Sequence, residues 1–169
     1  MIRNTFSLIR ALLAAALLAA TGAALAADGA APGSADIVST ARHAGNFTIL
    51  VQAIEAADLT ETLAGIGPFT VFAPTDKAFG KLPEAELDAL LRPENKDKLV
   101  RILSLHVIPG EAIDQNSLKR VRSVETVAGE AIRPAMVRGR LRINDARVTS
   151  EIGASNGIIH AIDSVLIPN

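Results

Sequence analysis

The spacing of apolar residues changes part-way along this chain, and this change constrains the fold more than any other feature. Up to residue 105, apolar side chains recur every three or four positions, as they do on one face of a helix. After Pro109-Gly110 they occur in short β-branched runs that turn residues separate. Helices in one half and strands in the other predict a domain of the α+β class.

The first half predicts short helices around a single strand. Apolar positions at helical spacing predict two or three helices before a Gly-Pro stop, and two more after it; these segments are 37–63, 82–91 and 99–103. The β-branched and aromatic run 69–72 predicts a strand that ends at Pro74. Thr75 or Asp76 then caps a new helix.

The second half predicts an antiparallel meander. Its β-prone runs are 121–127, 131–137, 141–143, 148–152 and 158–167. The turn pairs that separate them are Ala128-Gly129, Arg138-Gly139, Asn144-Asp145 and Asn156-Gly157. The last run is apolar on both sides, so we expect it to be a central strand.

The N-terminus has the pattern of an export signal. Arg3 and Arg10 precede an apolar run, and small residues at Ala24 and Ala26 follow it. We therefore expect a signal peptide over 1–26, a flexible spacer over 27–35 and one domain over 36–169. The alternative is an uncleaved anchor, but the apolar run is shorter than the roughly 20 residues that span a bilayer. A secreted or periplasmic protein without a transmembrane span follows from this interpretation.

Cysteine content and charge exclude several classes of protein. The chain has no cysteine, which excludes disulfides, thiol catalysis and thiolate metal sites. Cleavage of the leader leaves 15 basic against 18 acidic residues, so the exported protein is mildly acidic. A nucleic-acid-binding domain is normally strongly basic, and we therefore expect no nucleic-acid partner.

Three segments of the chain resemble the signature segments of the fasciclin domain. They are TVFAPTDKAF at 70–79, LHVIPG at 105–110 and NGIIHAIDSVLIP at 156–168, and they occur in the family's order. The resemblance, which covers about 37–168, implies short N-terminal helices packed on a wedge-shaped antiparallel β-sandwich. It also implies a secreted or membrane-anchored protein of adhesion, in a family without a common enzymatic activity.

The resemblance also selects five motif positions with structural or interaction roles: Thr75, Asp76, His106, Asn156 and His160. In animal adhesion members a Tyr-His pair in the middle segment is linked to integrin binding. Here Leu105 takes the tyrosine position and only His106 matches, so integrin recognition is not implied.

Two of these positions lie at predicted helix ends. Asp76 suits the amide end of one helix, and a protonated His106 would suit the carbonyl end of another. They can be separate caps, but we predict that they pair across the interior, because a buried polar group needs a partner. His160 shares a strand face with Ile158 and Ile162, which predicts a hydrogen-bonded core histidine rather than a ligand.

The sequence offers little support for a metal site, a cofactor or catalysis. The three histidines, His43, His106 and His160, lie far apart in sequence, and no run of alternating acids resembles a calcium loop. The chain has no nucleophile-elbow pattern and no glycine-rich phosphate loop. We therefore expect a protein without cofactor that is not an enzyme.

Charge is distributed unevenly along the chain. Residues 119–147 hold eight basic and three acidic residues, whereas 28–118 hold seven basic and 13 acidic ones. Alternation puts Arg140 and Arg142 on one strand face, and a neighbouring strand can add further arginines. The predicted anion-binding patch is Arg133, Arg140, Arg142 and Arg147. The alternative is a solvated sheet face that prevents edge pairing.

The leading hypothesis is a secreted or periplasmic, non-enzymatic binding module for adhesion or for contact with the cell surface or matrix. Its expected partner is a protein or polysaccharide, with peripheral contact to anionic lipid as a further possibility. The alternative is a carrier of an apolar ligand such as a carotenoid or lipid, as some fasciclin-like proteins are. Five phenylalanines without Trp or Tyr offer few aromatic walls for such a ligand. A third hypothesis is a purely structural envelope component.

Overall fold

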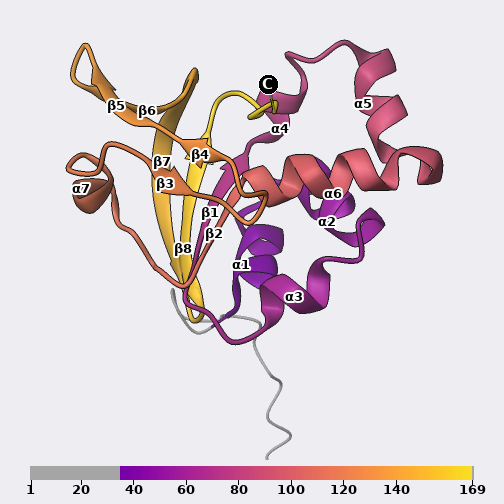
Figure 1. Ribbon diagram of the computed structural model, residues 1–169. Coiled ribbons are helices and arrows are strands. Elements are labelled where there is room, and N and C mark those ends of the chain that lie inside the picture. Colours follow the sequence, from indigo (N-terminus) through magenta and orange to yellow (C-terminus); the bar gives the residue numbers. More distant parts are fainter. Residues whose placement is uncertain (1–34, 169) are drawn as a thin grey trace, which may run out of the picture.

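The computed structural model describes residues 35–168, and these residues form an α+β domain. Most helices lie on the right of Figure 1, and a strongly curled sheet lies on the left, with one short helix beside it. The predicted signal peptide at 1–26 and the predicted spacer, apart from Ala35, lie outside the described residues. Within residues 35–168, no helix has both the length and the apolar character that a membrane span requires.

The helical half contains short helices, as its sequence pattern predicts. Three of them precede the first strand: α1 (Ile37–Ala44), α2 (Thr48–Ala56) and α3 (Thr60–Ala64). The next group is α4 (Asp76–Phe79), α5 (Glu84–Leu91), the 3₁₀ turn η1 (Pro93–Asn95) and α6 (Lys96–Leu105). A further short helix, α7 (Gln115–Leu118), connects the helical half to the later strands.

The main sheet has six strands in the order β2-β1-β8-β7-β6-β5. Their bounds are β1 (Phe69–Pro74), β2 (Val107–Pro109), β5 (Pro134–Val137), β6 (Arg140–Ile143), β7 (Ala146–Ala154) and β8 (Gly157–Ile162). A separate pair is formed by β3 (Val124–Glu125) and β4 (Ala131–Ile132). The predicted central position of the last strand is confirmed, because β8 lies between β1 and β7.

The structure differs from the predicted meander at its beginning, at its end and in the partner of β1. The predicted run 121–127 keeps only β3, which pairs with β4 outside the main sheet, and the run 131–137 is divided between β4 and β5. The meander β5-β6-β7-β8 is antiparallel as predicted, but β1 pairs with β8 in parallel, from Phe69 opposite Gly157 to Pro74 opposite Ile162. The predicted strand over 158–167 ends at Ile162, and the chain beyond it crosses to α6, where Leu166 N donates to His106 Nε2.

The sheet separates two apolar clusters. One lies between the sheet and the helices and includes Val71 and Ile159; the other lies on the opposite side and includes Phe72 and Ile162. This division follows from the alternation of side chains along β1 and β8. Because β8 is buried on both faces, its sequence is apolar throughout except at His160.

Candidate functional site

Thr75 and Asp76 fix the short helix α4 against its surroundings. Thr75 is the N-cap of α4, and its Oγ1 accepts a hydrogen bond from Ala78 N at 3.3 Å. The Asp76 carboxylate serves a different helix, because its Oδ1 accepts from Ile49 N at 2.9 Å, in the first turn of α2. Asp76 N also donates to Asn46 O at 2.9 Å. Asp76 therefore joins the beginnings of α4 and α2.

His106 is the buried C-cap of α6 and has both ring nitrogens bound. Nδ1 lies 2.7 Å from Ile102 O, and Nε2 lies 3.0 Å from Leu166 N. A carbonyl only accepts and an amide N–H only donates, so the ring is neutral with its proton on Nδ1. Burial lowers the pKa of His106 to about 4, against a smaller opposite effect of the Ile102 carbonyl.

The predicted pairing of Asp76 with His106 is therefore wrong. Both ring nitrogens of His106 are bound to backbone groups, while the Asp76 carboxylate caps α2. His106 does end α6, but with a neutral ring, because burial disfavours the protonated form. Asp76 and His106 thus each form hydrogen bonds with backbone groups and not with each other.

His160 lies in the core, stacked on Phe72 with a centroid distance of 5.5 Å. Its Nε2 lies 2.7 Å from Ile113 O, and this carbonyl places the ring proton on Nε2. Within the described residues Nδ1 has no hydrogen bond, and it lies 3.7 Å from the Glu151 carboxylate on β7. Burial lowers the pKa of His160, although the Ile113 carbonyl and the Glu151 and Asp114 carboxylates oppose the shift.

Asn156, in the turn between β7 and β8, joins three elements. Its Oδ1 accepts from Ile37 N at 2.9 Å, at the start of α1. Its Nδ2 donates to Leu63 O at 2.8 Å and to Gly65 O at 2.9 Å, at the end of α3. A Cβ at the following Gly157 would overlap Phe69 O, so only glycine fits beside β1.

The predicted basic patch lies on the outer part of the sheet. Arg140 and Arg142 project from β6 on the face opposite to the buried Leu141 and Ile143, as alternation predicts. Arg147 on β7 is the direct register partner of Arg142.

These arginines, together with Arg138, Val137 and Asp163, line a hollow of about 680 Å³. We call Arg138, Arg140, Arg142 and Arg147 the arginine face. Arg133 lines an adjacent hollow of about 510 Å³ with Asn144 and Asp145. The structure thus adds Arg138, which the sequence pattern placed only in a turn, and separates Arg133 from the other predicted members.

Most charges of the arginine face have no acidic partner. Among residues 35–168, no ion pair involves Arg138, Arg140 or Arg142. Arg147 Nε lies 3.8 Å from Asp163 Oδ2, and Lys81 Nζ lies 3.7 Å from the same oxygen. Burial opposes ionisation of Asp163, but the Arg147 amide and the Lys81 ammonium hold its pKa below the ordinary value.

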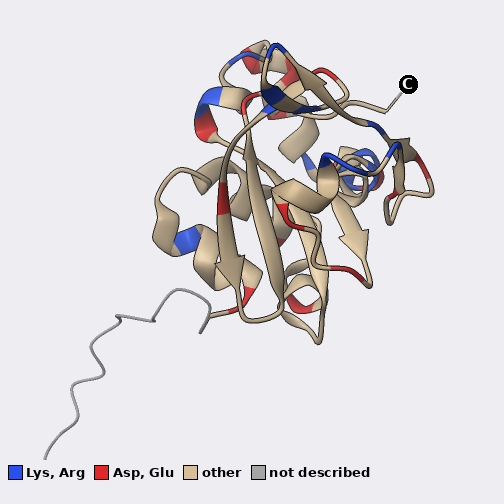
Figure 2. Ribbon diagram, turned by 90° about the vertical axis from the view of Figure 1, so that its left-hand side faces the viewer, with Lys and Arg blue, Asp and Glu red and all other residues tan. Residues whose placement is uncertain are grey.

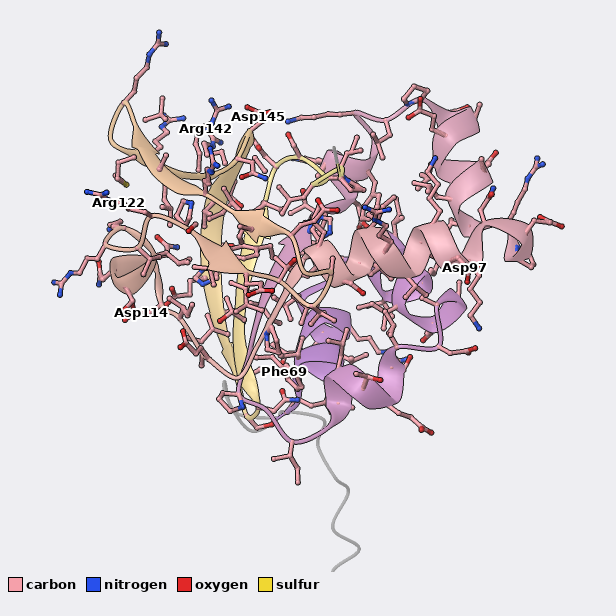
Figure 3. All side chains as sticks on the ribbon, viewed as in Figure 1. Phe69, Asp97, Asp114, Arg122, Arg142 and Asp145 are labelled. Atoms are coloured by element: carbon pink, nitrogen blue, oxygen red, sulfur yellow. The ribbon has the colours of Figure 1, made fainter. Side chains whose placement is uncertain are left out.

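The figures place this face at one end of the molecule. Basic segments lie mostly in the upper half of Figure 2. Figure 3 shows Arg142 at the upper end of the sheet, near the turn that carries Asp145, with Phe69 at the opposite end. Among the described residues, no three His, Cys, Asp or Glu side chains converge as metal ligands do.

Comparison with known proteins identifies the domain. Residues 45–168 match the family profile described as Fasciclin domain. The chain belongs to the fasciclin domain family. Protein sll1483 of Synechocystis sp. is 47% identical over 135 residues, which are 78% of this chain and 73% of that protein. The expectation from the three signature segments is thus confirmed.

Two further similarities come from animal proteins. Transforming growth factor-beta-induced protein ig-h3 of Oryctolagus cuniculus is 37% identical over 142 residues, which cover 81% of this chain but 20% of that protein. A solved FAS1 domain pair from the insect cell adhesion molecule Fasciclin I has a TM-score of 0.73 at 19% identity, over 80% of this chain and 52% of that one. The latter similarity shows that the two proteins share a fold.

Proposed function

We propose that this fasciclin domain protein is a secreted or periplasmic, non-enzymatic binding module for adhesion to the cell surface or matrix. The arginine face is its contact for an anionic partner. One observation carries this proposal: four arginines line a single hollow that contains one acid, Asp163. A guanidinium matches a carboxylate or sulfate with two parallel N–H donors, so this face suits such groups.

The position of the arginines in the sheet favours binding over edge protection. The edge of the main sheet nearest to these arginines is β5, whose residues Pro134–Val137 carry no charge. Arg142 and Arg147 lie one and two strands inward from that edge, where charges do not block pairing with another chain. Arg142 and Arg147 are also opposite each other in register, and like charges in that position are destabilising. A binding role gives a reason for this arrangement.

The similarities support the adhesion part of the proposal. The solved domain pair comes from an insect cell adhesion molecule, as its description states. The leader pattern at 1–26 supports export, because it combines a basic start, an apolar run and a small-residue cleavage site. An exported domain with an unneutralised cationic face meets anionic polymers directly outside the cytoplasm.

Chromatography on an immobilised anionic polysaccharide tests the proposed contact. The exported protein is expected to be retained at low salt and released at high salt, because salt screens exposed charges. The double variant Arg140→Ser/Arg142→Ser should elute early. A matched control, Arg92→Ser/Lys98→Ser, removes the same charge from exposed residues at the helical end and should leave retention unchanged. Equal loss in both variants would leave only net charge as the cause and contradict the proposed face.

A second candidate function is transport of an apolar ligand, and one hollow favours it. Leu82, Leu90, Ile102 and Val165 line a space of about 380 Å³ between α5 and α6. Helix α5 buries none of its residues completely, so a ligand there would complete its packing. Protein purified from its own host should then show a visible absorption band or yield a lipid on organic extraction. Colourless, lipid-free protein would exclude this candidate.

A further inference from the structure

A second basic hollow adjoins the arginine face. It has a volume of about 550 Å³, and its wall includes three basic residues, Lys77, Lys81 and Arg147, and two acids, Asp76 and Asp163. Arg147 and Asp163 belong to the walls of both hollows. We call this second space the lysine hollow. The two hollows are therefore neighbours that share one wall.

The sheet topology explains why residues distant in sequence meet here. Because β1 and β8 are parallel, their C-terminal ends lie at the same end of the sheet, with Pro74 opposite Ile162. The chain leaves β1 into α4, which leads to Lys77 and Lys81, and it leaves β8 at Asp163. Strand β7 is antiparallel to β8 and begins at this same end of the sheet, which brings Arg147 close to Asp163 and the two lysines.

Two acids line the lysine hollow, Asp76 and Asp163, and each makes contacts within the domain. Asp163 lies 3.7 Å from Lys81 Nζ and 3.8 Å from Arg147 Nε, and its other oxygen accepts from Arg147 N at 2.9 Å. The Asp76 carboxylate accepts from Ile49 N. Asp163 therefore holds Lys81 and Arg147 side by side where the hollows meet, but it can neutralise only one of them.

The remaining positive charges lie at both ends of the paired hollows. Lys77 lines the lysine hollow, and three arginines line the other; within the described residues, none of these four forms an ion pair. A ligand that neutralises both ends must carry negative charges at intervals along an extended body. The polar walls of the lysine hollow, such as Thr75 and Thr149, also suit the hydroxyl groups of a sugar.

We infer that the two hollows form one extended site for a linear acidic polysaccharide, in which the lysine hollow binds units beyond those held by the arginine face. This inference rests on the proposed function and names its ligand class. A chain of uronic acid units carries one carboxylate per unit and can follow two hollows in line. The threonine hydroxyls in the wall of the lysine hollow suit the hydroxyl groups of a sugar chain, so the lining favours the polysaccharide over a membrane.

Chain-length dependence tests the extended site. The affinity of the exported protein is measured for a uronic acid dimer and octamer at low salt. Lys77→Ser/Lys81→Ser should weaken octamer binding roughly fivefold to tenfold, the effect of two exposed ion pairs, and leave dimer binding unchanged. Arg140→Ser/Arg142→Ser should weaken binding of both. Arg92→Ser/Lys98→Ser is the matched control, and a neutral glucose octamer should not bind.

Each other outcome overturns a defined part of the inference. If the arginine variant weakens octamer binding and the lysine variant does not, the extended site is wrong and the proposed function stands. If neither variant changes binding, both proposals are wrong. If the wild type ignores the octamer but binds phosphatidylglycerol vesicles, the ligand is a membrane and the polysaccharide assignment is wrong.

A variant at the junction between the two hollows gives an independent test, because it should raise octamer affinity rather than lower it. Asp163→Asn removes the negative charge between the hollows, while the Asn Oδ1 can still accept from Arg147 N. Octamer affinity should rise roughly twofold to fivefold, because the ligand no longer faces this carboxylate. Unchanged or weaker octamer binding, with an unchanged thermal unfolding midpoint, would contradict the placement of the ligand across the junction.

Discussion

Polar side chains of the interior and of the arginine face differ in how many partners they have within the domain. The buried His106 and the half-buried Asn156 bind backbone groups with every side-chain nitrogen and oxygen, whereas Nδ1 of the buried His160 has no hydrogen bond within the described residues. On the arginine face, Arg138, Arg140 and Arg142 form no ion pair within the described part of the chain. The motif residues thus account for the fold, and the unneutralised charges outside the motifs are the candidates for function.

The cost of an unpaired group explains this difference. An unsatisfied buried donor or acceptor costs about 1–3 kcal/mol, so interior polar residues persist where they have partners. An exposed guanidinium keeps its hydration and costs little when it has no partner. If the comparison holds, interior substitutions change stability, whereas substitutions on the arginine face change binding.

The largest effect is expected for Asn156→Ala. The variant leaves Ile37 N, Leu63 O and Gly65 O without the Asn156 side chain, and it should lower the free energy of unfolding by about 3 kcal/mol. Urea denaturation measures the loss. Asn116→Ala, at an exposed position whose side chain accepts a hydrogen bond from Lys119 Nζ, should cost less than about 0.5 kcal/mol. Similar losses in the two variants would remove the special role of Asn156.

The second effect is a loss of stability in mild acid. Unfolded His106 binds a proton below its ordinary pKa of 6.5, but the folded protein keeps the ring neutral down to about 4. Its contribution is therefore complete above pH 6.5 and is lost as the pH falls toward 4. Between pH 7 and pH 5 the free energy of unfolding should fall by roughly 2 kcal/mol from this residue.

His160 acts in the same direction, because burial lowers its pKa as well. Denaturation of His106→Gln at both pH values isolates the contribution of His106. The amide can accept from Leu166 N but does not titrate, so the pH dependence of this variant should be smaller than that of the wild type. An unchanged pH dependence would show that His106 is not the group responsible.

A smaller effect is expected at the cap of α4. Thr75→Ala removes the acceptor for Ala78 N and should lower stability by about 1 kcal/mol. Thr62→Ala is a suitable control, since Thr62 is exposed within α3. Thermal unfolding of both variants checks the prediction, which fails if the Thr75 variant is as stable as the control.

The smallest change in stability is expected for Arg140→Ser/Arg142→Ser. Neither arginine has an acidic partner among residues 35–168, and Arg142 lies opposite Arg147. The free energy of unfolding should stay within about 0.5 kcal/mol of the wild type, with a slight gain at low salt from relief of repulsion. A loss above about 1 kcal/mol in urea denaturation would show that the arginine face is structural, and the comparison would fail.

Much of the fold was predictable because its signals are local. Helical spacing from Ile37, the stop before Phe69 and the turns at Arg138-Gly139 and Asn144-Asp145 each depend on a few adjacent residues. The alternation at 140–143 likewise predicted which residues face solvent. Contacts between segments distant in sequence were harder to predict from the sequence. The pattern at Asp76 predicts a cap, but it does not specify which helix end in space receives the carboxylate.

The residues alone were enough to assign the α+β class and the family and to choose Arg140 and Arg142 as surface charges. The folded domain was needed to show that β1 pairs in parallel with β8, that His106 binds Leu166 N rather than Asp76, and that Lys77 and Lys81 adjoin the arginine face. The physical reason is distance along the chain. Periodicity and capping act within a few residues, whereas these contacts join segments whose proximity depends on the packing of the whole domain.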